Sequence, residues 1–240
     1  MSDPAETGDD WSRLRPAAAH MAKVMGAAAD TPIAAQWIDV DVSGARRLLA
    51  GDETELTLGS VFLWAAAASA WDVDALWYEY DLATLKRRRR DRLGVAMAVA
   101  TDRGLVVPTI WFSDQPDLST TAAALRETVQ RARDGKLDTD DRRVGSLAVT
   151  SIGGLGIDGG LPLMRPGELA ICGFSSVKPR PVVVDGELAI RETTVLTGTL
   201  DHRWVDGMSL AGMLVASRDR IESLDAEGVG TAHDGKEKDQ

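Results

Sequence analysis

The chain has 240 residues, of which 44% are hydrophobic, and its formal net charge is −10. This length and composition can bury one good core, which predicts a single compact domain. The negative charge argues against a nucleic-acid partner, because such binding needs clustered Lys and Arg that release counterions from phosphates. The single cysteine, Cys172, lies in an apolar run. We expect it to be a small buried hydrophobe in a reducing compartment, not a nucleophile.

Both ends of the chain are polar and charged. Residues 1–10 are acidic and lack the basic and apolar regions of a secretory signal, and residues 225–240 contain little apolar surface. No run approaches the length of a membrane span. We therefore expect a cytoplasmic protein with a disordered N-terminus (1–10), a folded domain (11–224) and a polar C-terminal tail (225–240).

The first half of the chain predicts helices and strands in irregular alternation. The expected elements are a helix over 16–29 that stops before Pro32, a strand over 34–42, a buried helix over 58–71, and strands over 95–100 and 105–110 that meet at a turn.

The second half continues the mixture. Ser119 is a good N-cap for a helix that Gly135 ends, and a last helix begins near residue 209. Strands are expected over 147–151, 169–174, 182–184 and 193–200. Because strict strand–helix alternation is absent, these elements predict an α/β sandwich with a mixed sheet, not a doubly wound fold.

Residues 201–207 read Asp-His-Arg-Trp-Val-Asp-Gly and follow a β-branched, threonine-rich run. They place an imidazole, His202, four residues before the carboxylate of Asp206. An imidazole can take a proton from a thiol or a hydroxyl at neutral pH. The spacing alone also arises by chance, and His202 could be a structural histidine, but the longer string D-H-R-x-x-D-G is far more specific.

That string resembles the active-site signature of the dihydrolipoamide acyltransferase catalytic domain of 2-oxo acid dehydrogenase complexes, a relative of chloramphenicol acetyltransferase. Further segments resemble the same family in the same order, namely 98–110, 132–137, 149–154, 168–171 and 180–186. The resemblance is strong from about Leu93 to Leu224. Before Leu93 it depends mainly on Thr31-Pro32 and on residues 39–42. It implies a chloramphenicol acetyltransferase-like two-layer sandwich.

The resemblance implies roles for three side chains. His202 would act as the general base, and Asp206 would pair with an arginine, Arg13 or Arg15, to fix the turn. Thr150, 52 residues before His202, would donate a hydrogen bond to the oxyanion. Ser151 is the fallback for this donor, because neighbouring strand residues face opposite ways. The alternative is that Thr150 is only a β-branched strand residue.

Two other motifs have weaker interpretations. The glycine-rich run 153–160 lacks the G-K-[ST] ending of a phosphate loop, so we expect a flexible turn. The basic run 86–92 is expected to be a solvated surface. Its functional alternative is a docking patch for phosphate or a carrier protein, because arginine binds phosphate in a bidentate manner.

The chain also departs from the family. We expect a catalytic core alone, without a lipoyl domain or a subunit-binding domain, and without the apolar C-terminal segment of cage-forming relatives. A homotrimer with its active sites between subunits fits this expectation, and a large cage does not. Trp204 stands where the family usually has a smaller aliphatic residue, and Trp111 stands where it usually has a basic residue. Together with Arg203 and Ser151 they are candidate substrate-binding residues, although both tryptophans could equally serve core packing.

We therefore expect a stand-alone acyltransferase. It would move an acetyl or similar acyl group from acetyl-coenzyme A or a carrier thioester to a small-molecule hydroxyl, as in tetronate-like polyketide antibiotic biosynthesis. No bound cofactor and no metal are expected. One alternative is a dihydrolipoamide acyltransferase core that works with a separate lipoyl protein. Another is a non-catalytic assembly subunit.

Overall fold

The computed structural model describes residues 12–51, 55–102, 104–225 and 228–229. Its helices are α1 (Pro16–Ala28), α2 (Ser43–Leu49), α3 (Leu58–Ala70), α4 (Leu118–Asp134) and α5 (Gly207–Glu222). Its strands are β1 (Ile33–Asp41), β2 (Tyr78–Asp81), β3 (Lys86–Arg89), β4 (Leu93–Met97), β5 (Val99–Thr101), β6 (Gly104–Val106), β7 (Thr109–Phe112), β8 (Leu147–Ser151), β9 (Ala170–Phe174), β10 (Lys178–Val184), β11 (Glu187–Asp201), β12 (Leu224–Asp225) and β13 (Gly228–Val229). The expected disorder of residues 1–10 and of most of 225–240 lies outside the described residues.

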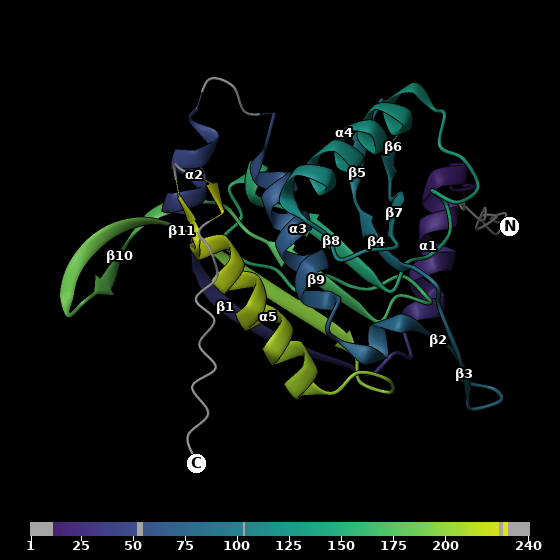
Figure 1. The fold of residues 1–240 in the computed structure, drawn as a ribbon. Helices are drawn as coiled ribbons and strands as arrows, with labels where there is room; N and C mark the ends of the chain where they lie inside the picture. Colours follow the sequence, from purple (N-terminus) through teal and green to yellow (C-terminus); the bar gives the residue numbers. More distant parts are fainter. Residues whose placement is uncertain (1–11, 52–54, 103, 226–227, 230–240) are drawn as a thin grey trace, which may run out of the picture.

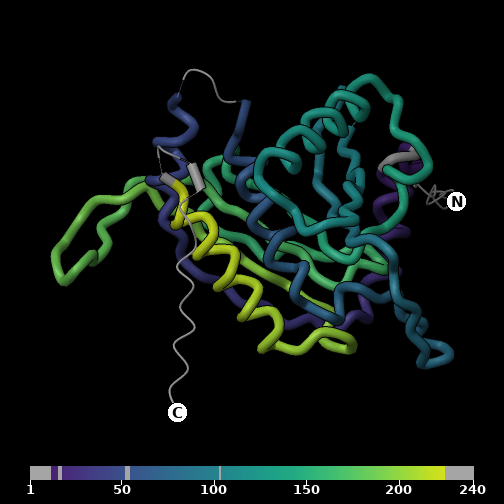
Figure 2. Tube along the Cα trace, in the orientation of Figure 1, coloured from purple at the N-terminus to yellow at the C-terminus, as the bar shows by residue number. Residues whose placement is uncertain are grey.

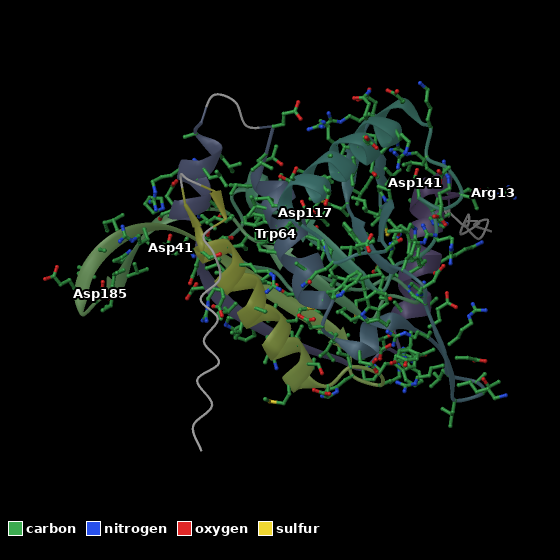
Figure 3. The ribbon with its side chains drawn as sticks, in the orientation of Figure 1. Arg13, Asp41, Trp64, Asp117, Asp141 and Asp185 are labelled. Atoms are coloured by element: carbon green, nitrogen blue, oxygen red, sulfur yellow. The ribbon has the colours of Figure 1, made fainter. Side chains whose placement is uncertain are left out.

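One mixed sheet forms the centre of the molecule, with strand order β1-β11-β9-β8-β4-β7. The pairs β8–β9 and β4–β8 are parallel, and the other neighbours along this order are antiparallel. β10 pairs with the first half of the long strand β11. These two strands leave the body as a hairpin (Figures 1 and 2), with Asp185 near its tip (Figure 3).

Helices α3, α4 and α5 cover one face of the sheet (Figure 1). α3 is apolar nearly all round because it is packed against the sheet, α4 and α5. Its Phe62 ring stacks on Phe174 of β9, with centroids 4.0 Å apart. Cys172, also on this face of β9, is fully buried, and burial raises the pKa of its thiol to about 12. The prediction that Cys172 is a buried small hydrophobe is therefore confirmed.

The opposite face of the sheet, which we call the loop face, carries no comparable helix layer among the described residues. Along one row of paired residues it presents Thr150, Gly173, Thr197 and Trp37. Residues 152–168 cross part of this face, where Met164 packs with sheet residues in a small second core. Trp37, on the edge strand β1, is 72% exposed. The two layers and the mixed sheet confirm the predicted α/β sandwich.

Most predicted elements are present, with shifted ends. α4 begins two residues earlier than expected, because Asp117, not Ser119, is its N-cap and accepts a hydrogen bond from the Thr120 N–H at 2.9 Å. Gly135 ends this helix in the left-handed conformation, with φ of 73°, as predicted.

Other elements differ more from the expectation. The predicted hairpin over 95–110 is split into the pairs β4–β7 and β5–β6, with Pro108, which has no N–H to donate, between β6 and β7. Helix α2 and the hairpin β2–β3 were not predicted. No helix in the part of the chain that the structure describes is long and apolar enough to span a membrane.

Gly153 anchors the loop over the loop face. A Cβ atom at Gly153 would lie 2.6 Å from the backbone oxygen of Ser175, whereas one at the neighbouring Gly154 would meet nothing within 4 Å. We therefore expect Gly153→Ala to lower the free energy of unfolding by about 1–3 kcal/mol, because backbone cannot yield as a side chain can. Gly154→Ala is the matched control and should change it by less than about 0.5 kcal/mol. Equal urea denaturation curves for the two variants would contradict this packing.

Candidate active site

His202 lies in the turn between β11 and α5. Its backbone N–H donates to the carbonyl oxygen of Pro32 at 2.9 Å, which ties the turn to the start of β1. The side chain is exposed. An exposed imidazole on a fixed backbone can reach a group that comes from outside the chain.

Asp206 closes this turn as the N-cap of α5. Its carboxylate accepts hydrogen bonds from the Ser209 N–H at 2.8 Å and from the Ser209 hydroxyl at 3.1 Å. These bonds lower the pKa of Asp206 below its ordinary value, with a smaller contribution from His202. The expected partner, Arg13 or Arg15, makes no ion pair with Asp206 within the described ranges. Within the described residues the N-terminal end of α5 holds this carboxylate, and an arginine partner stays a prediction.

Asp201 and Arg203 lock the other side of the turn. Asp201 is 3% exposed, and its carboxylate accepts from Arg203 Nε at 2.8 Å and from Arg203 Nη2 at 2.6 Å. Arg203 also donates to the Thr31 hydroxyl at 3.3 Å. Sequence reasoning gave Asp201 no role, although it opens the signature string. The Arg203 guanidinium is thus paired within the chain. Its role as a substrate ligand stays a prediction.

Thr150 lies on the loop face of β8 and lines a small, mostly apolar pocket of about 200 Å³. Gly173 forms part of its floor, and Pro162 closes over it, where a Cβ at Gly173 would lie 3.3 Å from Pro162 Cγ. Ser151 points to the opposite side of the strand and does not line this pocket. The geometry favours Thr150 over Ser151 as the oxyanion donor.

One chain does not bring Thr150 and His202 together. Thr150 pairs with Gly173 on β9, and Gly173 pairs with Thr197 on β11. His202 comes five residues after Thr197. At a strand rise of about 3.3 Å per residue, this separates the two side chains by roughly 16 Å along the strand direction. At this separation the Thr150 hydroxyl and the His202 imidazole of one chain cannot touch the same thioester, as the roles expected from the sequence would require. We call their two places half-sites.

The two tryptophans are engaged within the chain. Trp204 is half-buried and stacks on Tyr80, with ring centroids 4.6 Å apart. The indole N–H of Trp111 donates to the Asp140 carbonyl at 3.0 Å, and its ring lies 4.8 Å from the Arg143 guanidinium. Trp111 does not line the Thr150 pocket, so the packing alternative holds best for it. A role for Trp204 in acceptor choice stays a prediction.

The basic run forms strand β3 and its continuation. The arginines of β3 are engaged: Arg88 binds Glu79, Arg89 lies 3.4 Å from Asp74, and Arg87 stacks over the Tyr78 ring at 4.0 Å. The glycine-rich run contains only the short turn Gly153–Leu155, without a helix that could receive phosphate. In the residues described, no group of three or more His, Cys, Asp or Glu side chains could hold a metal ion.

Comparisons with known proteins place this geometry in a family. The model of the 2-oxoacid dehydrogenases acyltransferase (catalytic domain) matches residues 7–227. The succinyltransferase component of the 2-oxoglutarate dehydrogenase complex of Cupriavidus necator is 36% identical over 128 residues, which are 53% of this chain and 31% of that protein. The lipoamide acyltransferase component of the branched-chain alpha-keto acid dehydrogenase complex of Pseudomonas aeruginosa is 30% identical over 172 residues, 72% of this chain and 40% of that protein. The chain thus matches less than half the length of these relatives.

Solved structures share the fold. A probable dihydrolipoamide acetyltransferase from Listeria monocytogenes superposes with a TM-score of 0.81 at 25% identity, over 93% of this chain and 98% of that one. The dihydrolipoamide acetyltransferase of Azotobacter vinelandii, studied for the catalytic role of a serine, a histidine and an asparagine, gives 0.74 at 22% identity, over 92% and 96%. Chloramphenicol acetyltransferase gives 0.53 at 16% identity, over 79% and 88%. The chain belongs to the family of 2-oxoacid dehydrogenase acyltransferase catalytic domains.

Proposed function

We propose that the chain transfers an acyl group between coenzyme A and a dihydrolipoyl thiol, with His202 as the general base and Thr150 as the oxyanion donor. The sequence offered this reaction as an alternative to transfer onto a small-molecule hydroxyl. The relatives favour the alternative. The named relatives are lipoamide or dihydrolipoyllysine acyltransferases. No comparison supports a small-molecule hydroxyl acceptor in a tetronate-like pathway.

The observation that carries the proposal is a match of three polar side chains in spacing. In the Azotobacter enzyme the serine precedes the histidine by 52 residues, and the asparagine follows the histidine by four. Thr150, His202 and Asp206 have the same two spacings and comparable chemistry. Their positions in the structure agree with such roles, because His202 is exposed and Thr150 lines a pocket.

The chemistry needs little more than these groups. His202 takes the proton of the attacking thiol as its sulfur bonds to the thioester carbonyl carbon. Thr150 donates a hydrogen bond to the oxyanion that forms on the carbonyl oxygen. When the tetrahedral adduct collapses, the carbon–sulfur bond to the first thiol breaks, and His202 returns the proton to that departing sulfur. Asp206 touches none of these atoms and acts as a positioning residue.

The two half-sites require a second copy of the chain. In a ring, Thr150 of one copy can face His202 of the next, although the two residues lie far apart within each chain. The resemblance to the family implies that this ring is a trimer. The expectation against a large cage has no support, because the cubic core of a pyruvate dehydrogenase complex has this fold, with a TM-score of 0.73.

Acyl transfer from acetyl-coenzyme A to dihydrolipoamide tests the proposal. His202→Ala should lower kcat about 10²–10⁴-fold, and Thr150→Ala about 10²–10³-fold, because they remove the base and the oxyanion donor. Ser151→Ala is the matched control and should keep its rate. Transfer only to hydroxylated acceptors would restore the first expectation. No transfer and no thioester hydrolysis would favour a non-catalytic assembly subunit.

The cap on α5 gives a separate prediction. Asp206→Ala should lower the Tm by a few degrees and reduce kcat, because α5 and the His202 turn lose their cap. Asp206→Asn keeps a hydrogen-bond acceptor and should retain both the Tm and kcat.

The folded-state pKa of Asp206 is depressed, so the stabilisation that its carboxylate provides is present above the ordinary pKa of 3.8 and is lost as pH falls through the lower folded value. The Tm of Asp206→Asn should therefore fall less than that of the natural chain between neutral pH and pH about 3. Identical pH dependence would contradict this role.

A further inference from the structure

A second cavity lies beside the turn that carries His202, apart from the Thr150 pocket. Its volume is about 540 Å³, and it is lined by the β2 side of the hairpin β2–β3, by Arg90, by residues 143–144 and 166–169, and by Asp201, Arg203 and Trp204. The side chains that matter most in its wall are Glu79, Tyr80, Arg90, Arg143, Arg203 and Trp204. The proposed acyl transfer uses none of these groups.

The ion pairs around this cavity leave positive charge in excess. Six arginines pair with only four carboxylates: Arg88 and Arg90 with Glu79, Arg92 and Arg143 with Asp140, Arg165 with Glu168, and Arg203 with Asp201. Two guanidinium charges therefore remain without a counter-charge within these pairs. Such an excess stands out in a chain whose formal net charge is −10.

Arg90 is the least satisfied of the six. Its side chain is 7% exposed, and its Nε is buried without a hydrogen-bond partner among the described residues. Its Nη1 lies 3.3 Å from a Glu79 oxygen but does not form a well-aligned hydrogen bond. Burial lowers the pKa of Arg90, because desolvation penalises its charge. A buried, partly unpaired guanidinium in a cavity wall is costly unless an anion offsets it.

The remaining wall holds two stacked aromatic rings beside the carboxylates of Glu168 and Asp201, which are paired with arginines. Tyr80 and Trp204 stack at 4.6 Å with their ring planes 17° apart. Behind the arginines, the Trp111 ring lies within 6 Å of three guanidinium carbons, those of Arg90, Arg92 and Arg143. Stacking of this kind holds guanidinium groups in place and limits water, which strengthens their attraction for an anion.

We propose that this cavity binds a small dianion, such as phosphate or a dicarboxylate, between Arg90 and Arg143. Two negative charges match the local excess, and guanidinium groups suit the paired oxygens of both ligand types. The ligand would lie against Trp204 and Arg203, which follow His202 directly in the chain. The site is independent of the proposed acyl transfer, so His202→Ala should bind the dianion as the natural chain does.

Isothermal titration calorimetry at constant ionic strength tests this site with inorganic phosphate, succinate and acetate. We expect saturable binding of phosphate or succinate with one site per chain, and weaker binding of acetate, which carries one charge. The tighter of the two dianions identifies the ligand as phosphorylated or as a dicarboxylate. Arg90→Gln and Arg143→Gln should each weaken binding about tenfold or more, because a charge-assisted hydrogen bond is lost.

Arg143 is about half exposed, so Arg143→Gln should fold even where Arg90→Gln does not. Arg126→Gln is the matched control, since Arg126 is an exposed, ion-paired arginine that does not line this cavity. Absence of saturable binding by both dianions would overturn the proposal. So would acetate binding as tightly as the dianions, or an Arg126→Gln variant that loses as much affinity as Arg143→Gln.

Discussion

The register of β8, β9 and β11 is the constraint on which the rest of this protein depends. It fixes Thr150 opposite Gly173 and Gly173 opposite Thr197, while His202 follows the end of β11. Because hydrogen-bonded strands cannot slip without moving every core side chain to the other face, this separation is rigid. In the proposed mechanism the oxyanion donor therefore lies at one end of the sheet and the base at the other, so a second copy of the chain has to bring them together.

The packing of the two sheet faces explains where each half-site lies. The helices bury the alternate side chains that form the core, among them Phe174 and Leu200, so chemistry is left to the other face and to the strand ends. On the loop face, Gly173 lets Pro162 approach and close the pocket beside Thr150. At the end of β11, Asp206 and the Asp201–Arg203 pair hold the His202 turn from both sides. Both half-sites are thus held by groups that take no part in the reaction.

The sequence could predict what is local. The string at 201–207 identified the His202 turn, and strand alternation correctly separated Thr150 from Ser151. It could not predict strand register or the partners of charged groups, because both depend on residues far apart in the chain. Arg90 and Glu79, for example, form an ion pair across the hairpin β2–β3. The strands of this hairpin are polar, so no pattern of apolar residues predicted it. The cap by Asp206 did have a local signal, an aspartate just before a helix, but the resemblance to the family directed attention to an arginine.

We propose that each active site combines Thr150 of one copy with His202 of another. The most direct test of this claim is to unfold Thr150→Ala and His202→Ala chains together, refold the equal mixture, and measure acyl transfer to dihydrolipoamide. Random assembly around a ring leaves about one site in four with both natural residues, so the mixture should regain about a quarter of the natural activity while each variant alone stays inactive. A mixture no more active than its parents would contradict the claim and would place both groups in one chain.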